Sequence, residues 1–272
     1  MNNFGITLSD GTGYPNYTAS LGESYDNIAD GLWGVQKMYD AGKIPFVHIM
    51  FHPSRQPECT IQKIADGDYD HLIENYFMKY LSYTMAGGRV VFVYLPEMNG
   101  DWTIYGPTGH PTWTADPEAF KTAYRNFVEK GRSMGIEALW CWAPNNYGYG
   151  NLEDWYPGDE WVDIVGMSAY QWAGLYPGYE WKSVSKLLDP TVVEVRLFTK
   201  KPLVITQIAS GLNDDRTPGF LDELVMYTKI ENNIDGFIWF NIGEFALGTG
   251  TDWETQTAPL DSVPPEHWFF DC

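Results

Sequence analysis

The sequence predicts an α/β protein and, within that class, a closed (β/α)8 TIM barrel. Short runs that are apolar on both faces, as buried parallel strands are, alternate with amphipathic segments along the chain. The length of 272 residues fits one barrel of about 250 residues. A doubly wound sheet would need a glycine-rich phosphate loop after its first strand, and Gly11-Thr-Gly13 is too weak a match. We therefore predict a single domain over residues 1–272.

Seven apolar runs are predicted to be strands. They span residues 4–8, 44–50, 89–95, 136–142, 162–167, 201–206 and 235–240. A barrel needs an eighth strand, and two intervals could contain it, residues 14–39 and residues 50–87. In the fourth run, Trp140 and Trp142 are two residues apart, so both should point to the same face of the strand.

Three helices are predicted between these strands. The clearest begins at Asp116-Pro117, an N-cap residue followed by proline at the first helical position. Its apolar residues recur at helical spacing, and the segment ends between Gly131 and Gly135. Residues 69–85 and 219–231 have similar patterns.

Composition excludes several classes of function. Seventeen basic and thirty-six acidic residues give a net charge of −19, which disfavours nucleic acid and anionic membranes as partners. Three scattered cysteines form no disulfide framework or metal motif. No apolar run approaches the roughly 18 residues of a membrane span, and no signal peptide is recognisable. We expect a secreted or cell-surface protein if a signal has been removed.

Polar and aromatic residues follow the predicted strands at the points where the strands end. In barrels of this type the active site lies at the carboxyl ends of the strands. These positions hold Glu97, Asn99, Trp102, Asn145, Asn146, Tyr170, Trp172, Gln207, Trp239 and, after the second run, His52. Amides and acids bond sugar hydroxyls, and aromatic rings stack on the CH faces of sugars. The pattern therefore predicts a site for a polyhydroxylated ligand, and Glu97 is its strongest candidate for a general acid.

Several sequence pieces resemble glycoside hydrolase family 26, a family of retaining clan A enzymes that includes β-mannanases, β-1,3-xylanases and mixed-linkage glucanases. They are Pro96-Glu-Met-Asn-Gly-Asp-Trp102, Trp142-Ala-Pro-Asn145, Tyr156-Pro-Gly-Asp-Glu-Trp-Val-Asp-Ile-Val-Gly166, Lys201-Pro-Leu-Val-Ile-Thr-Gln207 and Gly236-Phe-Ile-Trp-Phe-Asn241. Together with residues 64–70 they occur in the family's order. The resemblance implies an endo-acting retaining β-glycanase that needs no metal or organic cofactor and acts, as a monomer, on a neutral β-linked polysaccharide or oligosaccharide.

The resemblance also assigns roles. It implies that Glu97 is the acid/base, that position 207 is the nucleophile site, and that Tyr170 hydrogen-bonds the nucleophile. It further implies that Trp102 and Trp239 form sugar platforms near the cleavage point. His52, Asn99, Asn145 and Trp172 are the other predicted substrate-binding residues. His48, inside a strand run, is expected to be a core residue.

The chain departs from the family pattern in two regions, at position 207 and just before Glu97. Position 207 is Gln, and a neutral amide cannot form a glycosyl ester. We therefore expect little or no hydrolysis by the chain as written. The family's mannanases usually have His just before the acid/base and Arg a few residues earlier, where this chain has Pro96 and Val93. That departure argues against a specific preference for mannan.

Three interpretations of the chain remain open. The first is a catalytic domain with an isosteric substitution at position 207, and we favour it because the surrounding pattern, including Tyr170, is kept. The second is a natural non-catalytic carbohydrate-binding protein on the same fold. The third is an acidic interaction protein that uses the barrel as a scaffold. Glu244 as a replacement nucleophile is a weak alternative, because it lies beyond the strand end.

Overall fold

A computed structural model describes residues 3–7, 21–29, 31, 35–40, 44–107, 116–173, 175–210, 214–230 and 234–240. Within these ranges, eight strands pair in parallel and in chain order, and β8 pairs back to β1. The strands are β1 (Asn3–Thr7), β2 (Leu21–Asn27), β3 (Ile44–Met50), β4 (Val91–Tyr94), β5 (Leu139–Trp142), β6 (Ile164–Gln171), β7 (Leu203–Ser210) and β8 (Gly236–Trp239). The predicted α/β class with a parallel sheet is confirmed.

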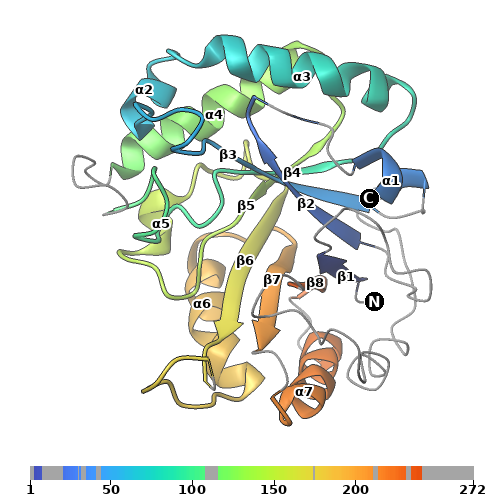
Figure 1. The fold of residues 1–272 in the computed structure, drawn as a ribbon, viewed down its shortest axis with the longest axis vertical. Coiled ribbons are helices and arrows are strands. Elements are labelled where there is room, and N and C mark those ends of the chain that lie inside the picture. Colours follow the sequence, from blue (N-terminus) through green and yellow to red (C-terminus); the bar gives the residue numbers. More distant parts are fainter. Residues whose placement is uncertain are drawn as a thin grey trace.

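Seven helices are described between the strands (Figure 1). They are α1 (Val35–Asp40), α2 (Ile61–Ala65), α3 (Asp70–Met85), α4 (Pro117–Ser133), α5 (Leu152–Trp155), α6 (Val184–Phe198) and α7 (Thr217–Ile230). Residues 8–20, after β1, and residues 241–272, after Phe240, lie outside the described residues. No helix in the described part of the chain is both long and apolar enough to cross a membrane.

The strand missing from the sequence prediction is β2, which lies within residues 14–39, one of the two intervals considered. The helix predicted from Asp116-Pro117 is α4. The Asp116 carboxylate accepts a hydrogen bond from the Ala119 N–H, and Pro117 occupies the first turn, so the helix begins where its capping residues require.

The core has two layers, one on each side of the strands. The inner layer fills the space enclosed by the strands with Ile44, Phe46, Val91, Val93, Cys141, Ala143, Ile164, Val204 and Ile238. The outer layer packs strands against helices and is rich in aromatic rings. Phe92 of β4 lies against Phe77 of α3 and Phe127 of α4, at 5.9 and 6.3 Å between ring centroids. Such packing fixes each strand end relative to its neighbours.

Trp140 and Trp142 both face this outer layer. Trp140 contacts Phe127, and Trp142 contacts Phe198 at the end of α6. Cys141, between them, belongs to the inner layer. The two indoles therefore share a face, as their spacing predicted, and that face is covered by helices.

Candidate active site

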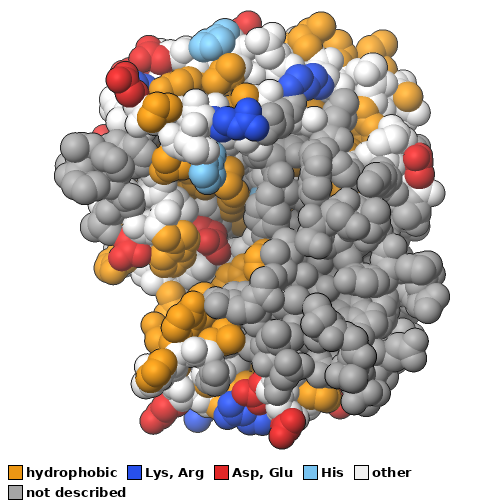
Figure 2. Space-filling model, viewed as in Figure 1, with side chains coloured by type: hydrophobic (Ala, Val, Ile, Leu, Met, Phe, Trp, Pro, Cys, Tyr) orange, Lys and Arg blue, Asp and Glu red, His pale blue; other side chains and the backbone are white. Residues whose placement is uncertain are grey.

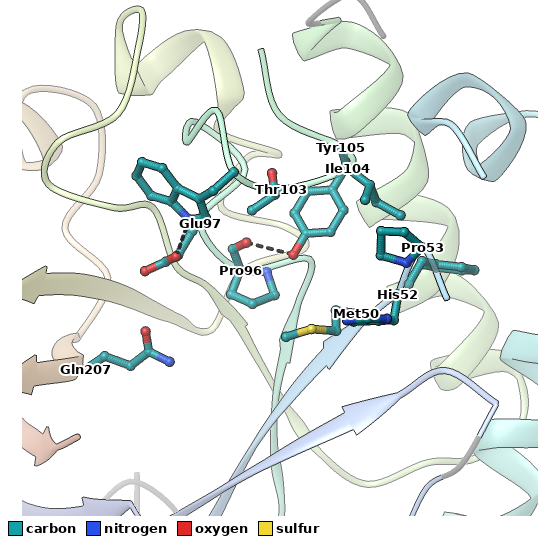
Figure 3. Close-up of a pocket in the computed structure, with 11 residues that line it drawn as sticks. Met50, His52, Pro53, Pro96, Glu97, Thr103, Ile104, Tyr105 and Gln207 are labelled. Carbon is teal, nitrogen blue, oxygen red and sulfur yellow. Dashed lines mark hydrogen bonds between the residues drawn. The ribbon is translucent and has the colours of Figure 1, made fainter. Parts of the chain in front are cut away.

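A pocket of about 340 Å³ opens at the carboxyl ends of the strands, which is where ligands bind in folds of this type. Four of the predicted site residues, Glu97, Gln207, His52 and Trp102, line it. They come from three separate parts of the chain, after β3, after β4 and within β7 (Figure 3). Both side chains to which the family resemblance assigns catalytic roles therefore share one cavity.

Glu97 has both carboxylate oxygens engaged. Asn145 Nδ2 donates to Oε1 at 2.8 Å, and Trp102 Nε1 donates to Oε2 at 2.6 Å (Figure 3). The backbone N–H of Glu97 donates to Ala143 O at 2.7 Å, which ties the end of β4 to the end of β5. The carboxylate is thus held in one orientation, with the partly exposed Trp102 ring beside it.

The backbone that carries Glu97 is strained. Leu95 and Glu97 have φ angles of 49° and 57°. These lie in the left-handed region, which residues other than glycine seldom adopt. Strain of this kind persists only where the surroundings enforce it, and it clusters at functional sites. Gly100 follows in the same turn, where an added Cβ would lie 2.4 Å from the Trp102 ring. Glycine at position 100 therefore allows the indole to reach Glu97.

Tyr105 stabilises the turn that carries Glu97 through a hydrogen bond to its backbone. It is buried, and its hydroxyl donates to Pro96 O at 2.9 Å. Burial raises the pKa of Tyr105, and the negative charge of Glu97 raises that pKa further. Both effects favour the protonated hydroxyl, which is the form that donates to Pro96 O.

Gln207 lies opposite, almost completely buried. Its Oε1 accepts hydrogen bonds from Ser168 Oγ at 2.9 Å and Tyr170 Oη at 2.8 Å, and its Nε2 lies 3.5 Å from His48 Nδ1. The strand register shifts between Met167 and Ser168, so that Ser168 pairs with Gln207. Such an irregularity re-aims side chains, and here it coincides with the position that presents Gln207 to the pocket.

Two of these contacts were missed from the sequence. His48 was expected to be an ordinary core residue, and it is fully buried, but it lies on the same inward face as Phe46 and reaches Gln207. The alternation along β3 was the available signal, because residues 44, 46, 48 and 50 share one face. Ser168 gave no signal beyond its place at the end of an apolar run.

Asn99 requires a correction. Its side chain is 1% exposed, and it clasps the backbone of Asn145, donating to Asn145 O at 2.7 Å and accepting from Asn145 N at 2.8 Å. Its amide is therefore occupied by the protein, and the predicted contact with substrate does not fit this geometry. Asn99 instead positions Asn145, which in turn holds Glu97.

Trp239 also requires a correction. The indole is fully buried and packs beside Phe220 of α7, at 6.3 Å between ring centroids. It faces the helical layer because Ile238, its neighbour in β8, occupies the inner layer. The aromatic residue that reaches the site from this strand end is Phe240, whose ring lies 5.5 Å from that of Tyr170.

The remaining predicted residues lie around the pocket. His52 lines it, with Nδ1 2.7 Å from Ser54 Oγ. Trp172 is partly buried and lies 5.4 Å from Tyr170 between ring centroids. Asn146 Nδ2 donates to Leu187 O, which anchors the loop after β5 to α6. Glu244 lies outside the described residues.

Comparison with known proteins finds similarity to one family of enzymes. The profile of glycosyl hydrolase family 26 matches residues 77–210, from α3 to the end of β7. Endoglucanase H of Acetivibrio thermocellus is 25% identical over 173 residues, which cover 61% of this chain and 18% of that protein. A mannan endo-1,4-beta-mannosidase of Bacillus subtilis is 32% identical over 120 residues, 42% of this chain and 29% of that protein. The matched regions are thus less than a third of these relatives' lengths.

Solved structures show the same fold. A family 26 β-mannanase from Bacteroides ovatus has a TM-score of 0.67 at 13% identity, covering 97% of this chain and 90% of that chain. The catalytic domain of an endo-beta-1,4-mannanase from Bacillus sp. JAMB-750 has a TM-score of 0.68 at 16% identity, covering 89% and 78% respectively. At such low identities, the similarity to these structures concerns the fold alone.

Proposed function

These similarities support membership of the chain in glycosyl hydrolase family 26, and on that premise we propose that it is an endo-acting β-glycanase domain with a neutral side chain at its nucleophile position. The proposal includes a single (β/α)8 barrel over residues 1–272. One observation carries it: Glu97 and Gln207 line the same pocket, each fixed by hydrogen bonds from neighbouring strand ends.

The proposed chemistry is a double displacement. Glu97 protonates the glycosidic oxygen as the bond breaks, and it later takes a proton from the attacking water. A carboxylate at position 207 would attack the anomeric carbon, and Ser168 and Tyr170 would fix the orientation of that carboxylate. The amide of Gln207 carries no negative charge, so neither the glycosyl ester nor charge stabilisation of the oxocarbenium ion is available. The chain as written would therefore bind glycan with little or no hydrolysis.

The substrate that we propose is a neutral β-linked polysaccharide. The net charge of −19 disfavours polyanionic chains, and the exposed Trp102 ring beside Glu97 provides a surface for a sugar face. Related proteins act on β-mannan and, by name, on glucan. Pro96 and Val93 stand where the family's mannanases usually have His and Arg, so we propose no preference for mannan over β-1,3-xylan or mixed-linkage β-glucan.

The test is Gln207→Glu, assayed on β-mannan, β-1,3-xylan and mixed-linkage β-glucan. The expected result is hydrolysis of at least one glycan, on the order of a thousandfold faster than with the parent chain. The matched control is the double variant Gln207→Glu with Glu97→Gln, which keeps the restored carboxylate and should lose the activity. Retention of the β-configuration in the first product would support the double displacement.

A second candidate is a glycan-binding protein without catalysis. The observation that favours it is the buried amide itself, whose oxygen accepts from Ser168 and Tyr170 and whose nitrogen lies 3.5 Å from His48 Nδ1. A folded Gln207→Glu variant that binds a glycan but hydrolyses none of the panel would support this candidate. A glycan array that detects no binding at all would instead favour the acidic interaction protein.

A further inference from the structure

We propose that the loop between β6 and α6 carries an outer sugar-binding subsite, formed by Tyr176 and Tyr179. It would take the part of a neutral β-linked oligosaccharide that extends beyond the pocket. This inference rests on the proposed function, and it adds a binding surface and two residues that the site near Glu97 and Gln207 does not contain.

Aromatic rings at the end of β6 and in this loop form a row that begins next to Gln207. Tyr170 hydrogen-bonds Gln207, and its ring lies 5.4 Å from Trp172. Trp172 lies 5.6 Å from Tyr176, and Tyr176 lies 6.4 Å from Tyr179. A ligand chain that leaves the pocket on this side would therefore meet one ring after another.

Exposure rises along the row from the inside outward. Tyr170 is 7% exposed and Trp172 is partly buried, whereas Tyr176 and Tyr179 are 45% and 52% exposed. In Figure 2, hydrophobic side chains gather on the surface where this loop lies in Figure 1, beside the end of β6. The inner rings are fixed by packing, and the outer rings present open surface to a ligand.

Hydrogen bonds and a tight turn fix the described part of this loop. Gln171 Nε2 donates to Lys182 O at 2.7 Å, which closes the loop at its base. Lys182 Nζ lies 4.6 Å from the centre of the Tyr147 ring and 2.5 Å from its hydroxyl, which joins this loop to the one after β5. Gly178, with φ of 91°, makes the turn between the two tyrosines. Preorganised rings lose little entropy on binding, as an effective sugar platform requires.

The chemistry of the row favours sugar over other occupants. Tyrosine offers a flat apolar face for sugar CH groups and a hydroxyl for sugar oxygens. The row starts at the Tyr170 hydroxyl, which holds Gln207, and Gln207 lines the pocket. A glycan long enough to leave the pocket would contact both the pocket and the outer rings.

The test compares long and short oligosaccharides by isothermal titration calorimetry with the full chain. The probes are mannohexaose, cellohexaose, mannotriose and cellotriose. Of the two hexasaccharides, the one that the parent chain binds more tightly should bind roughly tenfold more weakly to the double variant Tyr176→Ala with Tyr179→Ala. The affinity for the trisaccharides should not change. Tyr176→Phe with Tyr179→Phe keeps both rings and should retain most of the affinity. Leu197→Ala, at an 81% exposed position of α6, is the control for a surface apolar residue.

Each other outcome contradicts the inference in a recognisable way. If hexasaccharides bind and the alanine variant binds them as tightly as the parent, the outer subsite is wrong while the proposed function stands. If no oligosaccharide binds at any length, both proposals fall. If the parent chain dimerises and the alanine variant does not, the row is an interface with a second copy of the chain.

Discussion

The side-chain oxygen of Gln207 accepts two hydrogen bonds, one from Ser168 and one from Tyr170. Two donors on one oxygen suit a carboxylate better than an amide, because hydrogen bonds to a charged acceptor are about twice as strong. The surroundings of this position therefore favour a negative charge that the amide does not supply. Ser168 and Tyr170 could therefore hold a glutamate at this position by the same two hydrogen bonds.

Tyr170→Phe tests that argument in a chain that also carries Gln207→Glu. The variant keeps the ring that packs against Phe240 and removes one donor to the carboxylate. We expect kcat to fall roughly ten- to hundredfold, because a hydrogen bond to a buried charged group is worth about 1.5–3 kcal/mol. Steady-state kinetics on the preferred glycan measure the change. Unaltered kcat would mean that the hydroxyl does not serve position 207 during the reaction.

Beyond their ends, β4 and β5 are connected by side-chain hydrogen bonds in place of backbone pairing. Beyond the end of β4, Asn99 hydrogen-bonds both the N–H and the C=O of Asn145, as a neighbouring strand would. Gly148 makes room for this contact, since a Cβ there would lie 1.8 Å from Asn99 Nδ2. The loops after β4 and β5 are therefore locked together behind Glu97.

Asn99→Ala should break this lock. Two buried backbone groups lose their partner, and we expect the free energy of unfolding to fall by about 2–3 kcal/mol. In the Gln207→Glu background kcat should also fall, while KM changes less, because Asn145 would no longer hold Glu97. Urea unfolding and steady-state kinetics measure the two effects. Loss of stability with unchanged kcat would show that the clasp serves folding alone.

A second lock lies on the connection from α5 to β6. Tyr156 Oη and Thr199 Oγ1 both donate to Asp159 Oδ1, at 2.7 and 2.8 Å. The hydrogen bond from Tyr156 lowers the pKa of Asp159 most, and Thr199 and the charge of Lys201 lower it further against the opposing effect of burial. These contacts give Asp159 a structural role, because they join the connection before β6 to the end of α6.

The direction of this shift fixes a pH dependence. Because the folded-state pKa lies below the ordinary value of 3.8, the carboxylate stabilises the fold above that value. The contribution is lost as pH falls through the folded-state pKa. Asp159→Asn should therefore destabilise the protein near neutral pH and flatten the loss of stability below about pH 4. Urea unfolding from about pH 3 to 7 measures this, with Glu160→Gln as the matched control. Identical curves for parent and Asp159→Asn would contradict the prediction.

Sequence patterns predicted the elements that local chemistry determines. Seven strands followed from apolar runs, and α4 followed from its N-cap and its one-sided apolar pattern. β2 was not found because its sequence, Leu-Gly-Glu-Ser-Tyr-Asp-Asn, lacks an apolar run. α6 was not found because Pro190 interrupts it and normally argues against a helix interior. Where tertiary contacts override local preference, pattern alone gave no signal.

The sequence likewise predicted part of the candidate site, namely the residues whose position in the chain places them at strand ends. Position along the strands identified Glu97, Gln207, His52 and Trp102, because strand ends meet at one rim in a parallel sheet. The direction of a side chain was harder to predict, as Trp239 and Asn99 demonstrate. Trp239 faces the helices, and Asn99 faces the backbone of Asn145 in the loop after β5. The face to which a side chain points depends on strand register and on β-bulges, and both are determined by the packing of the whole fold.

At the scale of the whole molecule, the net charge of −19 should make thermal stability depend on salt, whereas the affinity for a neutral glycan should not. Excess like charge destabilises a compact state through self-repulsion, and salt screens it, with a Debye length of about 10 Å at 0.1 M. We therefore expect the Tm to rise between about 0.02 and 0.3 M NaCl. The affinity for a neutral hexasaccharide should stay constant over the same range, because stacking and neutral hydrogen bonds are not screened. Differential scanning calorimetry and titration calorimetry measure the two responses. A severalfold loss of affinity with salt would mean that charge contributes to binding, and that the ligand is not the neutral glycan proposed.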